Sequence, residues 1–201
     1  RAKTLSIPFT RAGRNLMDTV SIIIPCYNEE KTIDLLLSAL LQQTYPCQDL
    51  EVVIADGLST DQTRAAILAF QSEHPQMVVK LVDNPRRNIP AALNTALSVS
   101  TGTWIIRLDA HSTPAPDYVE RCVAALQRGD GDVVGGVWQI EPGAPGWIAR
   151  SIAHAAAHPF GVGDALYRFT TRAAVVDTVP FGAFNRALFE RVGKFDESLL
   201  T

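Results

Sequence analysis

Four clusters of polar residues follow apolar runs in this sequence, at positions where a parallel sheet would bind a ligand. The clusters are Pro25–Glu29, Asp56–Asp61, Asn84–Asn88 and Asp109–Ser112. In open α/β sheets, ligands bind beyond the carboxyl ends of the strands. Three of the clusters contain carboxylates and the remaining one contains two arginines. Together they predict one acidic pocket with arginines at its rim.

Asp109 and His111 are candidates for a pair of metal ligands. Alternate residues at a strand end point to the same side, so both side chains could bind one divalent cation. A carboxylate with an imidazole suits Mn²⁺, and Mg²⁺ less well. The alternative, which the spacing alone favours, is that Asp109 caps the next helix and His111 lies in a surface turn. Arg107 should face the same way as Asp109 and could pair with it or with a phosphate.

Three other residues could contact a ligand or could serve the structure alone. Asp56 could accept a hydrogen bond from a base imide, or it could serve the turn beside Gly57. His154 and His158 have the i, i+4 spacing of a zinc pair, but the residues between them include no Glu like that of HExxH. We therefore do not interpret the two histidines as a metal site.

Alternating strands and helices are predicted to position the clusters. Apolar, β-branched runs predict strands over 20–24, 51–55, 77–82, 103–108 and 132–137, with a short strand over 174–179. Apolar stripes predict helices after Asn28 and over 59–73, 90–99, 114–129, 147–157 and 186–192. Asn28 is expected to cap the first helix, and Ser59 with Gln62 to form a capping box. This alternation predicts an α/β domain with a mainly parallel sheet and helices on both faces.

Composition and charge exclude several classes of protein. A net charge of -3 argues against a nucleic-acid partner. The cysteines form no CxxC motif and so fit a reduced compartment without structural zinc: Cys26, Cys47 and Cys122. The loop after the first strand is not glycine-rich, which argues against a nucleotidyltransferase and a dinucleotide-dependent oxidoreductase. Residues 1–19 form a basic arm that is either solvated or in contact with an anionic membrane surface.

The order of the motifs resembles the large family of inverting glycosyltransferases, family two, which includes cellulose, chitin and hyaluronan synthases. The resemblance rests on Ser21–Glu30, Asp56–Asp61, Arg107–Ser112, Val179–Arg186 and Gly193–Glu197. The Asp-Ala-His-Ser form of the third motif and the loop Phe160–Gly163 are most similar to the succinoglycan branch, which builds bacterial exopolysaccharide.

This resemblance implies a GT-A fold, Rossmann-like, that binds a nucleotide-diphosphate sugar, usually a UDP-sugar, through Mn²⁺ or Mg²⁺. By position, Asp56 should meet the uracil, and His111 replaces the second carboxylate of the metal motif, beside Asp109. Arg86 and Arg87 could take over the phosphate contacts of an arginine that many members carry before Asn94. The implied nucleotide-binding set is Pro25, Tyr27, Glu29, Asp56, Arg86, Arg87, Asn94, Arg107 and Asp109.

The resemblance also implies an activity and a place for it. The expected reaction is transfer of a sugar, with inversion, to a glycan or lipid-linked acceptor in exopolysaccharide synthesis, at the cytoplasmic face of the plasma membrane. Residues 20–201 correspond to a GT-A domain whose ED and QxxRW motifs are expected beyond Thr201, so the catalytic base stays unassigned. These residues alone are expected to bind donor without transferring sugar. The alternative is a non-catalytic sugar-nucleotide-binding or scaffold module.

Overall fold

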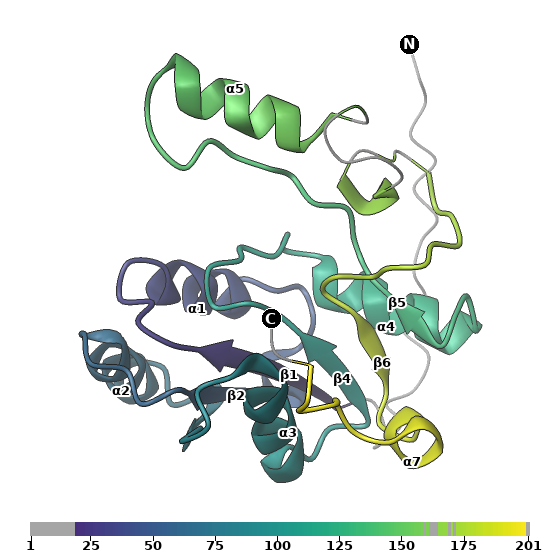
Figure 1. Cartoon of the computed structure of the whole chain (residues 1–201). Helices are drawn as coiled ribbons and strands as arrows, with labels where there is room; N and C mark the ends of the chain where they lie inside the picture. Colours follow the sequence, from purple (N-terminus) through teal and green to yellow (C-terminus); the bar gives the residue numbers. More distant parts are fainter. Residues whose placement is uncertain (1–18, 159, 161–164, 169, 171, 200–201) are drawn as a thin grey trace.

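The computed structural model describes residues 19–158, 160, 165–168, 170 and 172–199. Most of the predicted arm over 1–19 and most of the loop Phe160–Gly163 lie outside the described residues. A six-stranded sheet with the order β3-β2-β1-β4-β6-β5 forms the centre (Figure 1). Its strands are β1 Val20–Cys26, β2 Leu50–Asp56, β3 Val78–Asp83, β4 Trp104–Arg107, β5 Val133–Val134 and β6 Ala183–Asn185.

The first four strands are parallel, as predicted. Ile22 on β1 lies between Val52 of β2 and Ile106 of β4 in the strand register. The strand order reverses beside β1, and a crevice at such a switch point is where α/β proteins bind ligands. β6 pairs antiparallel with both β4 and β5, so the sheet is mixed at this edge.

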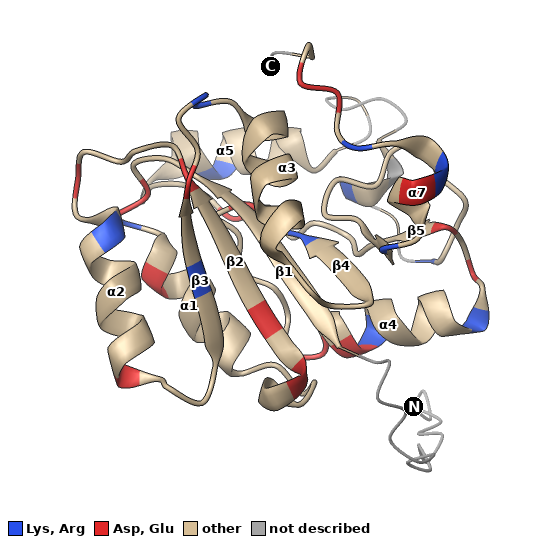
Figure 2. Ribbon diagram, turned by 90° about the horizontal axis from the view of Figure 1, so that it is seen from below, with Lys and Arg blue, Asp and Glu red and all other residues tan. Residues whose placement is uncertain are grey.

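Helices cover both faces of the sheet, which confirms the predicted α/β fold (Figures 1 and 2). The helices are α1 Ile33–Leu41, α2 Thr63–Glu73, α3 Ile89–Val99, α4 Tyr118–Arg128, α5 Trp147–Ala156 and α7 Leu188–Val192, with short 3-10 helices at Cys47–Asp49 and Leu166–Arg168. α1, α2 and α4 bury apolar side chains against one face, whereas α3 and α7 cover the other. Figure 2 shows α3 and α1 on opposite sides of the strands.

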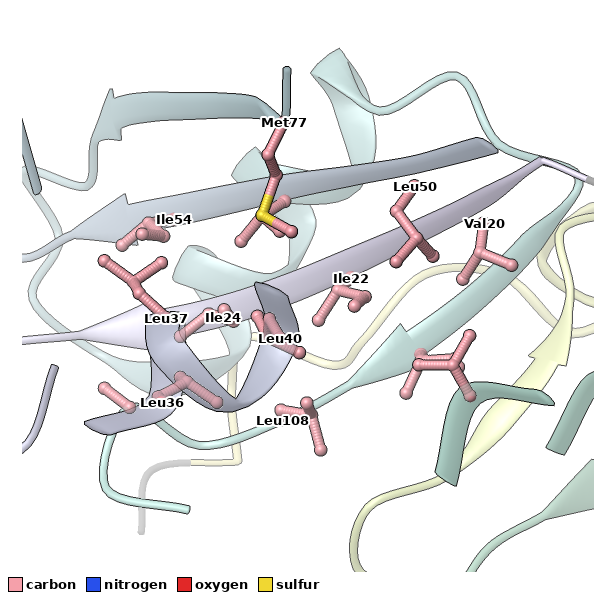
Figure 3. Close-up of a cluster of buried hydrophobic side chains, with 14 of the residues drawn as sticks. Val20, Ile22, Ile24, Leu36, Leu37, Leu40, Leu50, Ile54, Met77 and Leu108 are labelled. Atoms are coloured by element: carbon pink, nitrogen blue, oxygen red, sulfur yellow. The ribbon is translucent and has the colours of Figure 1, made fainter. Parts of the chain in front are cut away.

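The two faces receive alternate residues of the same buried strand. Ile22 and Ile24 of β1 lie in the cluster that includes Leu37 and Leu40 of α1 (Figure 3). Ile23 belongs to the cluster on the α3 side. All of these side chains are at most 1% exposed. A continuous apolar run is therefore needed on β1, because side chains of a strand point alternately to two covered faces.

Several local predictions were wrong. α1 begins at Ile33 and α2 at Thr63, so neither Asn28 nor Ser59 caps a helix. Only Val133–Val134 of the predicted strand 132–137 joins the sheet. Residues 174–179 form no strand, and Val175 is 97% exposed. The sheet instead uses β6, whose Ala183 and Phe184 are buried against β4.

Candidate functional site

Two loops at the carboxyl edge of the sheet are joined by hydrogen bonds from main-chain N–H groups to side-chain oxygens. The Asn28 N–H donates to Ser59 Oγ at 2.8 Å, and Asn28 Oδ1 accepts from the Thr60 N–H at 2.8 Å. The Glu29 N–H donates to Thr63 Oγ1 at 2.8 Å. Asn28 has a left-handed φ of 54°, which aims its backbone and side chain across to the second loop. The loops after β1 and β2 therefore form one continuous wall.

This wall borders a pocket of about 190 Å³ at the carboxyl ends of the first four strands. It is lined by Pro25, Cys26, Tyr27, Glu29, Gly57, Asn84, Arg87, Asn88, Ile89, Ala92, Asp109, Ala110 and His111. Six predicted site residues are thus together: Pro25, Tyr27, Glu29, Arg87, Asp109 and His111. All four polar clusters contribute to the lining, as the strand-end rule predicts.

Tyr27 and Arg87 face each other at the mouth of the pocket. The Arg87 guanidinium carbon lies 5.9 Å from the centroid of the Tyr27 ring, within the range of a cation–π contact. Arg87 has a φ of 52°, and its N–H donates to the Asn84 carbonyl at 3.1 Å. This tight turn directs the guanidinium over the pocket. An aromatic ring beside a cation suits a ligand that has both a flat base and a phosphate.

Asp56 lies beneath the pocket and does not line it. Asp56 is fully buried. One of its carboxylate oxygens accepts hydrogen bonds from Arg64 Nη1 at 2.7 Å and from the Ser59 N–H at 3.0 Å. The other oxygen accepts from Ser59 Oγ at 2.5 Å. Arg64 also pairs with Asp83 at the end of β3. In this structure the carboxylate organises the turn, as the second interpretation of Asp56 expects; its predicted contact with uracil stays a prediction.

Arg86 and Asn94 also lie outside the pocket lining. Arg86 forms an ion pair with Glu197. Asn94 Nδ2 donates to the Phe195 carbonyl at 2.9 Å and to Glu197 Oε1 at 2.8 Å, while Asn94 Oδ1 accepts from the Phe195 N–H at 3.0 Å. These contacts fix the segment after α7 against α3, so both side chains serve that junction here.

Arg107 pairs with Asp109, one of the two partners that its position allows. Arg107 Nη2 donates to Asp109 Oδ1 at 2.7 Å, and Arg107 Nη1 donates to the Pro180 carbonyl at 2.8 Å. Asp109 does not cap a helix, because α4 begins only at Tyr118, after Asp117. The helix-cap interpretation is therefore wrong. Arg107 lies beside the pocket and holds one of its carboxylates in place.

Asp109 and His111 have the chemistry of metal ligands, and the pocket contains both. His111 Nδ1 lies 3.1 Å from Glu29 Oε1, so a second carboxylate is nearby. Within the described ranges, no three His, Cys, Asp or Glu side chains are grouped so that they could hold a metal ion. A divalent cation would take only part of its shell from Asp109 and His111, and would need phosphate or water oxygens for the rest.

The pKa of the Cys26 thiol shows that the electrostatic field at the floor of the pocket is negative. Burial is the largest cause that raises the pKa of this thiol, and together with the nearby carboxylates of Asp56, Glu29 and Asp61 it brings the pKa to about 12. The thiol is therefore protonated at neutral pH and is no nucleophile. The negative field it senses is the kind that a bound cation would offset.

The sequence reasoning missed several residues that shape the site. Asn84 is buried, accepts a turn hydrogen bond from Arg87, and donates from Nδ2 to the Asn88 carbonyl at 3.0 Å. Both asparagines stand in the third polar cluster, so that cluster was the available signal. Arg64 had no such signal, because it lies within the predicted helix and its partners Asp56 and Asp83 come from two strands.

A mainly parallel sheet with a switch point at β1, and a pocket at its strand ends, is the arrangement in which open α/β proteins bind ligands. Residues 21–193 match the family described as Glycosyl transferase family 2. The chain belongs to this glycosyltransferase family, and its fold is GT-A.

Relatives and solved structures agree with this assignment. The succinoglycan biosynthesis protein ExoA of Rhizobium meliloti (strain 1021) is 41% identical over 116 residues, which are 56% of this chain and 34% of the relative. The mannosyltransferase PcManGT of Pyrobaculum calidifontis, solved with GDP-Man and Mn²⁺, is 30% identical with a TM-score of 0.66, covering 88% of this chain and 47% of that one.

A third similar protein, S. aureus TarS 1-349 solved with UDP, has a TM-score of 0.70 at 21% identity. The match covers 91% of this chain and 52% of the TarS chain, and it supports the fold. The chain thus spans about one third of its succinoglycan relative and about half of each solved chain.

Proposed function

We propose that this chain binds a nucleotide-diphosphate sugar, with UDP preferred, and forms the donor site of an inverting glycosyltransferase of bacterial exopolysaccharide synthesis. The observation that carries the proposal is the pocket in which Tyr27 and Arg87 lie with Asp109 and His111. An aromatic ring suits a base, a guanidinium suits a phosphate, and a carboxylate with an imidazole suits a divalent cation. Family membership favours this transferase role over a non-catalytic module.

The proposed reaction is a single displacement on the donor sugar. A hydroxyl oxygen of a glycan or lipid-linked acceptor attacks the anomeric carbon, while the bond to the diphosphate oxygen breaks and its electron pair leaves with UDP. A base takes the hydroxyl proton. Arg87 would stabilise the charge that develops on the diphosphate, and a divalent cation held by Asp109 and His111 would supply further positive charge.

Residues 1–201 alone are proposed to bind donor without turning it over. Asp196 and Glu197 are the last acids, and each has another partner. Asp196 accepts hydrogen bonds from the N–H and hydroxyl of Ser198, which hold the pKa of its carboxyl below the ordinary range. Glu197 is paired with Arg86 and Asn94. Neither carboxylate is poised to take a proton.

Calorimetric titration of the chain with UDP, GDP and ADP, in Mn²⁺ and in a chelator, tests the donor site. We expect UDP to bind most tightly and Mn²⁺ to strengthen its binding. Tyr27→Ala should weaken UDP binding, whereas Leu35→Ser, on the exposed side of α1, should leave it unchanged. Absence of binding by all three nucleotides would overturn the donor site. Preference for GDP, the nucleotide in PcManGT, would overturn only the choice of UDP.

Sugar transfer is measured separately, with UDP-sugars and glycan or lipid-linked acceptors. We expect donor binding without product, because Asp196 and Glu197 are held by other partners and the lack of a positioned base typically costs ~10²–10⁴ in rate. Measurable turnover would contradict this expectation and would make Asp196 and Glu197 the first residues to substitute.

A further inference from the structure

The outward face of α5 is apolar. Trp147, Ile148 and Ile152 are 73%, 58% and 64% exposed, and their positions fall on one side of the helix. Ala153, on the opposite side, is buried. A helix normally turns its largest apolar side chains toward the protein core, whereas α5 places these three outward and small alanines such as Ala153 inward.

The inner side of α5 is already anchored to the domain. Arg168 Nη1 donates to the Ala156 carbonyl at the end of the helix, at 3.3 Å. The Arg168 guanidinium also lies 5.2 Å from the ring centroid of Trp138, which stacks on Phe181 at 5.0 Å. Figure 1 shows α5 apart from the layers of helices that cover the sheet. Rotation of the helix would break the contact of Arg168 with Ala156, and among the described residues the large apolar side chains of α5 stay exposed.

The charges around α5 have one sign. No acidic residue occurs between Glu141 and Asp164, whereas Arg150 and His154 lie on one edge of the helix, next to the apolar face. Apolar and aromatic side chains beside an arginine, in a segment without acids, are a feature of helices that lie in the headgroup region of anionic membranes. Arg150 can keep its guanidinium at the phosphates while its stem covers apolar surface.

We propose that α5 is an interfacial helix that binds an anionic bilayer, with Trp147, Ile148 and Ile152 inserted among the acyl chains and Arg150 at the lipid phosphates. A protein partner fits less well, because three side chains of a short helix offer less surface than the roughly 800 Å² per partner of a stable interface. A bilayer requires no shape complementarity. The proposal rests on α5 and not on donor binding, and it is consistent with the expected location at a membrane face.

Vesicle co-sedimentation of the 201-residue chain tests the proposal. The vesicles are phosphatidylcholine alone, or phosphatidylcholine with about one third phosphatidylglycerol. We expect binding to the anionic vesicles, which the double variant Ile148→Ser/Ile152→Ser weakens about tenfold or more because two buried apolar side chains are lost. Arg150→Glu should weaken binding to the anionic vesicles as well.

The matched control is Leu35→Ser/Leu68→Ser, which removes two similarly exposed leucines from α1 and α2. It should bind like the unsubstituted chain, and all variants should keep its thermal unfolding midpoint. Equal vesicle binding by the α5 variant would overturn the proposal and assign the contact to another segment, such as the basic arm. Absence of vesicle binding, or a dimer in solution that the α5 double variant abolishes, would also overturn it.

Discussion

At the residue scale, the adjacent arginines Arg86 and Arg87 have different environments. Arg87 lines the pocket above the Tyr27 ring, whereas Arg86 is paired with Glu197. The difference arises from the left-handed backbone of Arg87, which turns the two side chains apart. A phosphate contact is therefore assigned more readily to Arg87 than to Arg86.

We predict that Arg87→Ala weakens UDP binding about tenfold, the amount expected for one charge-assisted hydrogen bond. Arg86→Ala serves as the matched control and should change the affinity less than twofold or so, because its partner Glu197 lies outside the pocket lining. Calorimetry on the two variants measures this. A larger loss in Arg86→Ala would mean that Arg86 leaves Glu197 for the donor.

Asp109 and His111 carry a prediction about metal dependence. Asp109→Asn and His111→Ala should each reduce the part of the UDP affinity that depends on Mn²⁺, because each removes one candidate ligand. His74→Ala, at the far end of α2, controls for loss of a histidine. If both site variants retain the full effect of Mn²⁺ on UDP affinity in calorimetry, any metal binds elsewhere. The role of Asp109 is then limited to its ion pair with Arg107.

At the scale of elements, the loop between α3 and β4 approaches β1 very closely. The Gly102 N–H donates to Ser21 Oγ at 2.7 Å. A Cβ added at Gly102 would lie 2.5 Å from the Ser21 nitrogen and 2.8 Å from the Val20 carbonyl carbon. Since these are backbone atoms of a central strand, they cannot move aside without disturbing the pairing of β1 with β4.

Gly102→Ala should therefore destabilise the fold by about 1–3 kcal/mol or more, the usual cost of an overpacked buried site. Denaturant unfolding measures the change. Gly143→Ala is the matched control, because nothing lies within 4 Å of its added Cβ. Similar stabilities for the two variants would show that the loop relaxes away from β1.

At the scale of the whole molecule, the two ends of the sheet have different roles. The pocket lies at the carboxyl end. At the amino end, Glu51 of β2 accepts hydrogen bonds from Ser21, Thr101 and Gly102 and forms an ion pair with Lys80 at 2.7 Å. Burial alone would raise the pKa of Glu51, but these partners outweigh it and lower the pKa to about 2. This cluster connects three strands and the α3–β4 loop far from the site.

The stability from the Glu51 cluster should depend on pH. Because the folded pKa lies below the ordinary 4.5, the stabilisation is present above pH 4.5 and is lost as the pH falls toward about 2. Glu51→Gln should cost about 3 kcal/mol at neutral pH, and the gap from the unsubstituted chain should close in acid. The test is to measure the free energy of unfolding across this pH range, with Glu73→Gln as control. A difference between Glu51→Gln and the unsubstituted chain that stayed constant with pH would contradict the assignment.

The parallel strands β1 to β4, the family and the sheet edge that carries the pocket could be predicted from the sequence. The apolar run of β1 and the polar clusters after the first four strands are local patterns, and local patterns predict strands, helices and the ends where ligands bind. The same local patterns predicted a strand wrongly where packing against the sheet determines which residues form one. Residues 174–179 form no strand, whereas Ala183–Asn185 does, because only the latter packs beside β4.

Which polar residues of those clusters line the pocket depends on contacts between elements that are far apart in the sequence. Asp56 pairs with Arg64, and Asn94 binds Phe195, which is 101 positions away in sequence. Such partners come from other elements, so no local spacing distinguishes a carboxylate that faces a ligand from one that holds a turn. The outward apolar face of α5 has the same origin: its apolar residues are visible in the sequence, but only the fold shows that Ala153 is buried while Trp147 and Ile152 are exposed.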